Sequence, residues 1–156
     1  MRLITFYKSP NSKIIVYERL LKHIVYTTDS FIINDSSKIK LENFVPNILL
    51  YTESLNYNAY YNKKIVIDQN GWIRPSFFES TFFGKVGDKS ISLILKNSKF
   101  AKYWKVKKDN IEVCKDCEFR YSCIDERIPH KSVKSKLWKF NSKCNYDPIN
   151  MNWLVN

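Results

Sequence analysis

The cysteines of this chain are confined to one stretch near its C-terminal end. All four lie between positions 114 and 144, and the first 113 residues contain none. They are Cys114, Cys117, Cys123 and Cys144. The Cys-x2-Cys step places two sulfurs on one tight loop, which suits a shared metal better than independent burial. The pattern predicts one metal or cluster site with four thiolate ligands. Two disulfides and four unrelated structural thiols are the alternatives.

The N-terminal residues bear on the redox state of these thiols. Residues 1–20 mix charged side chains with apolar ones and contain no continuous apolar core, so we expect no secretory signal. A cytoplasmic location follows as an expectation, and cytoplasmic thiols are normally kept reduced. This setting disfavours the disulfide alternative.

Spacing alone leaves the metal open. Zinc sites with four thiolates usually use two Cys-x2-Cys pairs, whereas here Cys123 follows Cys117 at a six-residue step and Cys144 stands alone. Iron–sulfur clusters also take four cysteine thiolates, at less symmetric spacings. We therefore favour one [4Fe–4S] cluster, with one Zn²⁺ as the alternative. His130 is the other candidate ligand for a zinc site, although we expect it in an exposed loop. Basic side chains around the cysteines, such as Arg120 and Arg127, would offset the negative charge of the thiolates.

The amino-acid sequence around the cysteines resembles that of a known family. Cys-Lys-Asp-Cys-Glu-Phe-Arg-Tyr-x-Cys-x-Asp at 114–125, followed by Lys-Cys-Asn-Tyr-Asp-Pro at 143–148, is similar to the C-terminal SPASM domain of radical-SAM peptide maturases. The branch it resembles is the peptide maturase of grasp-with-spasm systems, over residues 40–153. The resemblance implies one [4Fe–4S] cluster on the four cysteines. It also implies two partners, a ribosomally made precursor peptide and an ATP-grasp ligase.

The chain also departs from that family. The fuller pattern has further cysteines for a second auxiliary cluster, expected where this chain has 74–76 and 124–127, and neither segment contains one. The radical-SAM signature of three cysteines at x3 and x2 spacing is absent. A complete (β/α) barrel needs about 200 residues or more, and this chain has 156. We expect no cleavage of S-adenosylmethionine by this chain alone, and whether it is an enzyme stays open.

The sequence predicts an α+β fold with two parts. Residues 1–60 resemble a strand-rich remnant of a radical-SAM-like α/β region, and residues 61–156 a SPASM-like iron–sulfur domain. The expected elements are strands at 3–7, 31–33 and 48–51, with 13–28 ambiguous; a hairpin at 64–74 whose type I′ turn centres on Asn70-Gly71; a helix at 90–98 capped by Asp88 or Ser90; and a basic, helical crossover at 132–140.

The chain is strongly basic, with 26 Lys and Arg against 15 Asp and Glu and a net charge of +11. Between 85 and 108 there are eight lysines and one acid, Asp88. Such a surface attracts an acidic polypeptide. With interleaved aromatic residues it also suits nucleic acid, so a zinc-stabilised nucleic-acid-binding module is the rival function. No Gly-rich phosphate loop occurs, and no apolar run approaches the length of a membrane span.

Overall fold

A computed structural model describes residues 3–6, 13–17, 22–26, 39, 41–68 and 70–154. Contacts divide the chain into two compact units, Met1–Asn34 and Asp35–Asn156. This division falls earlier than the boundary that we expected after residue 60. The expected boundary separated a radical-SAM-like remnant from a SPASM-like domain, and this assignment of the two parts stays a prediction.

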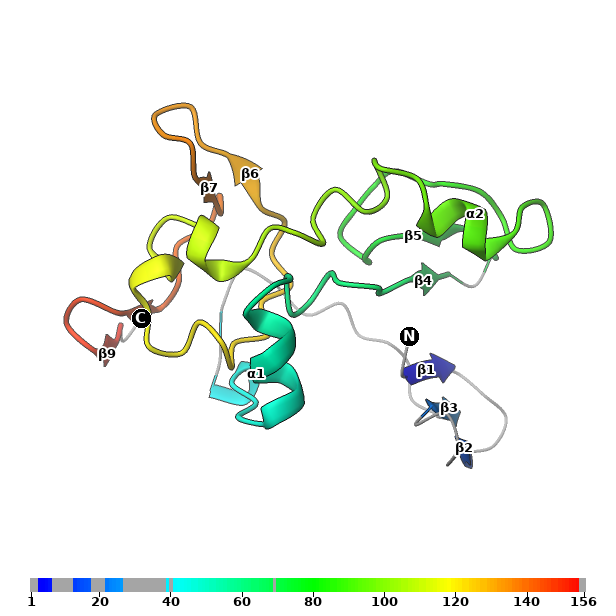
Figure 1. The fold of residues 1–156 in the computed structure, drawn as a ribbon, viewed down its shortest axis with the longest axis horizontal. Helices are drawn as coiled ribbons and strands as arrows, with labels where there is room; N and C mark the ends of the chain where they lie inside the picture. The colour runs from blue at the N-terminus through cyan, green and yellow to red at the C-terminus, as the bar shows by residue number, and fades with distance from the viewer. Residues whose placement is uncertain are drawn as a thin grey trace. The chain divides into compact units, whose positions relative to one another are not determined.

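The first unit contains a small mixed sheet. Its strands are β1 (Leu3–Phe6), β2 (Lys13–Tyr17) and β3 (Lys22–Tyr26), in the order β1-β3-β2 (Figure 1). β3 pairs parallel with β1 and antiparallel with β2. The strand expected at 3–7 is therefore confirmed, and the ambiguous segment 13–28 contains two strands. The strand expected at 31–33 lies outside the described residues.

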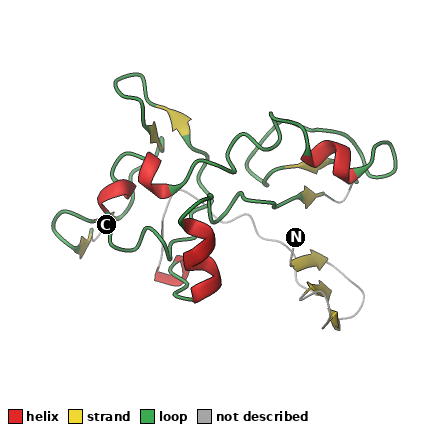
Figure 2. Cartoon of the chain, viewed as in Figure 1, coloured by secondary structure: helices red, strands yellow, loops and turns green. Residues whose placement is uncertain are grey.

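The second unit combines short helices with two-stranded hairpins (Figure 2). Its elements, in chain order, are η2 (Leu41–Asn43), α1 (Ile48–Ser54), β4 (Val66–Ile67), β5 (Ile73–Arg74), α2 (Ile91–Leu95), η3 (Lys108–Asn110), η4 (Cys114–Asp116), β6 (His130–Lys131), β7 (Trp138–Lys139), β8 (Tyr146–Asp147) and β9 (Asn152–Trp153). The content is mixed α and β, with little regular structure. No helix in the described part of the chain is long and apolar enough to cross a membrane.

The strand expected at 48–51 is wrong, because this segment begins helix α1. Asn47 has an extended backbone, and its side chain accepts a hydrogen bond from Leu50 N at 2.8 Å, which caps the helix. The β-branched and aliphatic residues that suggested a strand are not in a sheet. Ile48 is 71% exposed and Leu49 60%. The local cap therefore decides the conformation over the β-propensity of the side chains.

The hairpin expected at 64–74 is confirmed. β4 and β5 pair antiparallel, with Val66 opposite Arg74. The type I′ turn centred on Asn70-Gly71 is wrong, since Gly71 N donates to Asp68 O at 2.9 Å and the turn therefore spans 68–71. Gly71 ends the turn with φ at 81°, a conformation that favours glycine. The Asp68 carboxylate accepts from the N–H groups of Asn70 and Trp72, which stabilises this longer loop.

The helix expected at 90–98 is confirmed as the shorter α2. Ser90 occupies the N-cap position but makes no side-chain capping bond. α2 buries Ile94, which is 3% exposed, against Ile73 of β5 and Phe100. This small cluster joins the hairpin to the helix.

A second cluster supports the cysteine region. It contains five buried residues, Tyr60, Tyr61, Tyr103, Val106 and Ile111. Trp104 packs against this cluster and also against the cluster of Ile94 and Phe100. The indole therefore connects the hairpin and α2 to the part of the chain that carries the cysteines.

The helical crossover expected at 132–140 is wrong, because the chain forms a hairpin there. β6 and β7 pair antiparallel, with Lys131 opposite Trp138. Ser135 Oγ accepts from Leu137 N at 3.2 Å, so a serine side chain satisfies a backbone donor inside the turn. Such local bonds compete with helix formation. Glu112 N also donates to Trp138 O at 2.7 Å, and this bond ties the hairpin to the start of the cysteine loop.

Candidate metal centre

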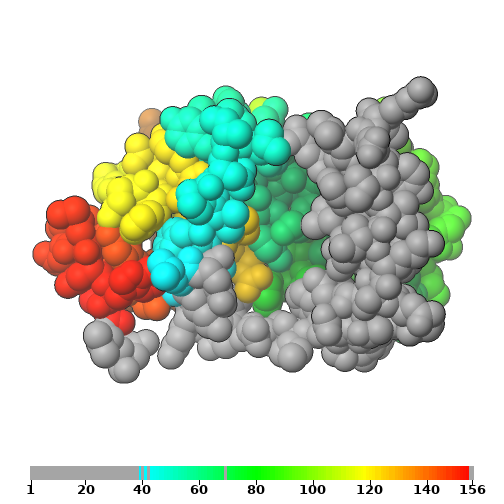
Figure 3. All heavy atoms as spheres, turned by 90° about the horizontal axis from the view of Figure 1, so that it is seen from below, coloured from blue at the N-terminus to red at the C-terminus, as the bar shows by residue number. Residues whose placement is uncertain are grey.

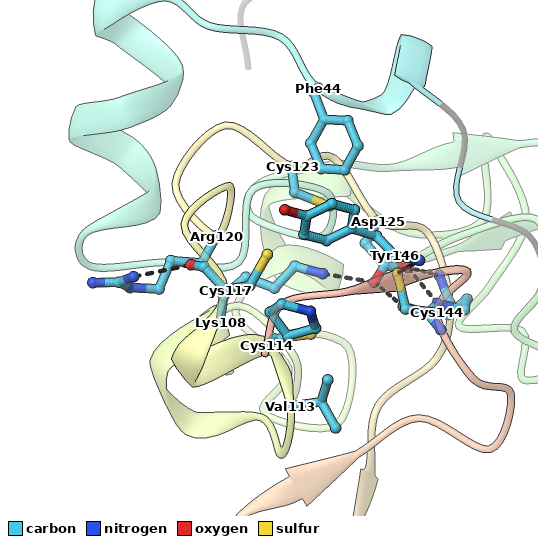
Figure 4. A pocket seen from close by; sticks show the side chains of 12 residues that line it. Phe44, Lys108, Val113, Cys114, Cys117, Arg120, Cys123, Asp125, Cys144 and Tyr146 are labelled. Carbon is cyan, nitrogen blue, oxygen red and sulfur yellow. Dashed lines mark hydrogen bonds and ion pairs between the residues drawn. The ribbon is translucent and has the colours of Figure 1, made fainter. Parts of the chain in front are cut away.

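All four predicted cysteines line one cavity (Figure 4). Cys123 is 8% exposed, and the other three are half-buried. All four are free thiols. The other lining residues are Phe44, Lys108, Val113, Arg120, Asp125, Arg127, Tyr146 and Pro148. Cys144 therefore lies at the same cavity as Cys114, Cys117 and Cys123, although it follows Cys123 by more than twenty residues in the sequence.

Cys114 and Cys117 are placed by one turn. Cys114 begins η4, and Cys117 N donates to Cys114 O at 3.1 Å, which closes the turn around the two thiols. Val113, just before it, has φ at 68°. With ψ at −50° and Cys114 N donating to Glu112 O at 2.8 Å, Val113 is the central residue of a γ-turn, a conformation that is rare and strained and occurs where the surroundings require it. The tight entry into η4 starts at this residue.

A separate segment holds Cys123. Phe44 forms a β-bridge with Cys123. On either side of this bridge, Val45 N donates to Ser122 O and Ile124 N to Asn43 O, both at 2.8 Å. In Figure 3 the cyan segment that leads into α1 lies against the yellow cysteine loop. The backbone around Cys123 is therefore fixed by pairing across some eighty residues of sequence.

Aromatic packing brings in Cys144. Tyr146 is 5% exposed, and its ring lies 5.1 Å from that of Phe119, edge to face. Its hydroxyl donates to the Glu118 carboxylate, between the second and third cysteines. Tyr146 N also donates to Cys144 Sγ at 3.5 Å. The Cys144 sulfur therefore already has an N–H donor.

A buried ionic cluster forms one wall of the cavity. Lys108 Nζ lies 2.6 Å from Asp125 Oδ2, and Arg127 donates to both oxygens of the same carboxylate, at 2.9 and 2.7 Å. The three side chains are 6%, 1% and 6% exposed. Arg127 also donates to Ser142 O, and both cations lie against the ring of Phe140. Two cations share one carboxylate, so this cluster carries a surplus positive charge.

Burial and these charges shift the pKa values at the site. Burial would raise the pKa of Asp125, but Lys108 and Arg127 outweigh it and lower that pKa to about 2. Burial likewise opposes protonation of Lys108, yet Asp125 and the nearby thiols raise its pKa. Burial raises the pKa of Cys114 to about 11 and that of Cys123 to about 12, against the opposing effect of Lys108. Cys114 and Cys123 are thus protonated until a metal displaces their protons.

The residues present suit a thiolate-bound inorganic centre by composition. The enclosed space of the cavity is about 30 Å³, far below the ~300 Å³ or more of pockets for organic ligands. Among the described residues, no three His, Cys, Asp or Glu side chains converge closely enough to hold a single metal ion. The four thiols surround the cavity instead. His130 is exposed in β6 and is not among the lining residues.

Sequence reasoning missed part of this site. Lys108 was one of eight lysines in its stretch, and nothing in the sequence set it apart. Phe44 belongs to the Phe-Val-Pro-Asn stretch at 44–47, which is part of the resemblance, but it lies some seventy residues before Cys114 and no role at the site was predicted for it. Tyr146 had the one usable signal, since it stands two residues after Cys144 in the Lys-Cys-Asn-Tyr-Asp-Pro motif.

Comparison of the chain with known protein families, curated proteins and solved structures identifies no related protein. No family model matches the chain, and no curated protein or solved structure does. The resemblance to SPASM domains therefore rests on the cysteine motif and its neighbouring residues.

Proposed function

We propose that this chain is a SPASM-like iron–sulfur protein of a ribosomal peptide maturation system, working in the cytoplasm. One [4Fe–4S] cluster is held by Cys114, Cys117, Cys123 and Cys144. The chain binds the precursor peptide, its partner ATP-grasp ligase, or both. It acts by binding, because the three-cysteine signature needed to cleave S-adenosylmethionine is absent from its sequence.

One observation carries the metal-site part of this proposal: four thiols and a surplus of buried positive charge line the same cavity. A buried charge without a partner is costly. Four thiolates bring more negative charge than a Zn²⁺ ion or a [4Fe–4S]²⁺ core neutralises, so either centre is anionic overall. An anionic centre would therefore balance Lys108 and Arg127, which share only Asp125.

The cysteine spacing favours a cluster over a single zinc ion. Zinc needs four sulfurs at about 2.3 Å from one point. In a four-iron cluster each thiolate binds a different iron, so the sulfurs stand further apart around the core. The uneven spacing of the cysteines in the sequence, together with the resemblance of the motif, supports the second case.

The chain's own residues would tune such a centre. The cluster supplies a covalent cross-link between distant segments and a one-electron redox couple. The N–H group of Tyr146 donates to the sulfur of Cys144. Lys108 and Arg127 place positive charge beside the thiolates. Both effects favour the more negative, reduced state of a cluster.

A zinc-stabilised nucleic-acid-binding module is the second candidate, and an exposed aromatic pair favours it. Trp72 is 40% exposed and Phe82 47%. Their rings lie 5.4 Å apart, and Arg74 lies over that of Phe82. Exposed aromatic rings beside a cation are the usual platform for stacking of single-stranded bases.

Anaerobic purification followed by metal and sulfide analysis tests the proposal. We expect about four irons and four sulfides per chain, with a broad absorption band near ~400 nm. One zinc per chain and no colour would overturn the cluster and favour the second candidate. The precursor and ligase roles are then tested by binding of the iron-loaded chain to each partner, with oligonucleotides as the comparison.

A further inference from the structure

A groove on the second unit lies apart from the cysteines. It is lined by Phe83, Lys89, Leu93, Ile94, Lys96 and Asn97 and has a volume of about 320 Å³. None of these residues lines the four-cysteine cavity. The volume falls within the ~300–1,000 Å³ of sites that bind small molecules or single anchor side chains.

The floor of the groove is apolar and fixed. Ile94 is 3% exposed and belongs to the cluster that contains Ile73 and Phe100. Phe83 packs against Phe100, with ring centroids 5.1 Å apart and the rings at 82°. Leu93 is 63% exposed at the same groove. A buried floor with an exposed leucine offers an apolar contact that nothing else in the described chain covers.

The edge of the groove is cationic. Lys89 and Lys96 are exposed, and neither has an ion-pair partner within the part of the chain that the structure describes. Other lysines of this basic stretch are paired: Lys102 with Glu79, Lys107 with Asp109, and Lys108 with Asp125. The unpaired cations of the stretch therefore include the two at the groove.

We propose that this groove is a docking site for an acidic peptide segment with an aliphatic anchor. The anchor side chain lies on Ile94 and Leu93, and flanking carboxylates pair with Lys89 and Lys96. The inference rests on the proposed peptide-binding function and deepens it, since such a segment would belong to the precursor peptide. It does not depend on the metal.

The two lysines at the edge of the groove favour an acidic partner by charge complementarity. The aliphatic floor favours a peptide over a nucleic acid. Bases bind by stacking on open aromatic faces, often with arginine beside them. Among the described residues that line the groove, Phe83 is the one aromatic side chain, and its ring packs against Phe100. These described lining residues include no arginine. Leucine and isoleucine instead match an aliphatic side chain, for which burial is favourable by about 25 cal/mol per Å².

Fluorescence anisotropy with a labelled peptide tests the site. The probe is a ten-residue peptide of glutamates around a central leucine, titrated with the iron-loaded full chain. A peptide with glutamine in place of glutamate, and one with serine in place of leucine, serve as ligand controls. We expect the probe to bind more tightly than both controls, and its affinity to fall as salt is raised.

Matched variants locate the binding. The double variant Lys89→Glu/Lys96→Glu should weaken binding of the probe by about tenfold or more, and Leu93→Ser should weaken it without any change of charge. Lys134→Glu/Lys136→Glu, on exposed residues of the β6–β7 hairpin, changes the net charge equally and should leave most of the affinity. An equal loss in both double variants, no binding of the probe, or tighter binding of an oligonucleotide through Lys89 and Lys96 would overturn the site.

Iron and sulfide are measured on the same samples, which separates the two proposals. An intact cluster without probe binding overturns the groove alone. Probe binding that depends on Lys89 and Lys96 in a chain without iron supports the groove and overturns the iron–sulfur function.

Discussion

Lys108 Nζ lies 2.6 Å from Asp125 Oδ2 in the wall of the four-cysteine cavity, although the two residues are seventeen positions apart. Their side chains are 6% and 1% exposed. Arg127 binds the same carboxylate. Lys108 and Arg127 share this single carboxylate, so the buried ionic cluster depends on Asp125 for its only negative charge. The remaining positive charge lies beside the thiols and would attract an anionic centre bound by them.

Replacement of this carboxylate should expose that dependence. Asp125→Asn leaves Lys108 and Arg127 buried without a counter-charge, and we expect a loss of about 3–5 kcal/mol in the free energy of unfolding. The loss should be smaller in the metal-loaded chain, where an anionic centre compensates the cations. Urea unfolding of both forms measures it. The control is Asp116→Asn, whose exposed pair with Lys115 should contribute less than about 1 kcal/mol. Equal small losses would contradict the surplus-charge argument.

The four cysteines should act as one set. Any single Cys→Ser change at 114, 117, 123 or 144 removes a ligand, and because binding of the metal is coupled to folding, we expect lower metal content and a lower Tm for each. Thermal unfolding and metal analysis of the four variants measure this, with Ser122→Ala as the control. Native stability in all four would rule out a four-ligand site.

Features of this fold that depend on local sequence patterns could be predicted, whereas features that depend on contacts between distant residues could not. The cysteine motif and the hairpin at 64–74 are local patterns. The hairpin is confirmed as β4–β5, and the four cysteines of the motif line one cavity, while their role as metal ligands stays a prediction. α1 was missed because its cap, Asn47, acts through one side-chain bond that outweighs the strand preference of Ile48. No local pattern assigned Lys108 or Phe44 a place at the site. Each belongs to the site only through a contact that spans a long stretch of chain, with Asp125 or Cys123.

Lys64 should make stability depend on alkaline pH. Burial lowers its pKa from 10.5 to about 8, and its ammonium lies 3.4 Å from the ring centre of Tyr60. The unfolded chain therefore binds more protons between pH 8 and 10.5, so this group makes stability rise with pH in that window. Lys64→Met should raise stability at pH 7 by about 1–2 kcal/mol and remove the rise.

Urea unfolding at several values between pH 7 and 9.5 measures the effect as a difference between variant and wild type. Lys63→Met, at the exposed neighbouring position, is the control and should change the pH dependence little. A difference that does not vary with pH would contradict the burial of the Lys64 ammonium.

Val113 offers a test of backbone strain. Its γ-turn conformation, with φ at 68° and ψ at −50°, is strained for an L-residue by about 1–3 kcal/mol, and glycine, which has no Cβ, adopts it at lower cost. Val113 is 57% exposed, so little packing is lost. We expect Val113→Gly to raise the free energy of unfolding by about 0.5–1 kcal/mol. Val133→Gly, at a position 95% exposed, should have no such benefit. Destabilisation by Val113→Gly beyond that of the control would show that the strained γ-turn at Val113 is absent.

Phe44 should protect the centre from solvent. Its ring lies 4.7 Å from that of Phe119 and 5.7 Å from that of Trp153, so it covers one side of the cavity (Figure 4). Phe44→Ala removes this cover, and we expect a loss of about 2–3 kcal/mol, lower than for a fully buried phenylalanine because Phe44 is only half-buried. The absorption band of the loaded protein should also bleach faster in air, since solvent and oxygen reach the thiolates more easily. Phe82→Ala, which removes a 47% exposed ring, should leave the bleaching rate unchanged. If both variants bleach at the wild-type rate while Phe44→Ala is destabilised, Phe44 supports the fold but does not shield the centre.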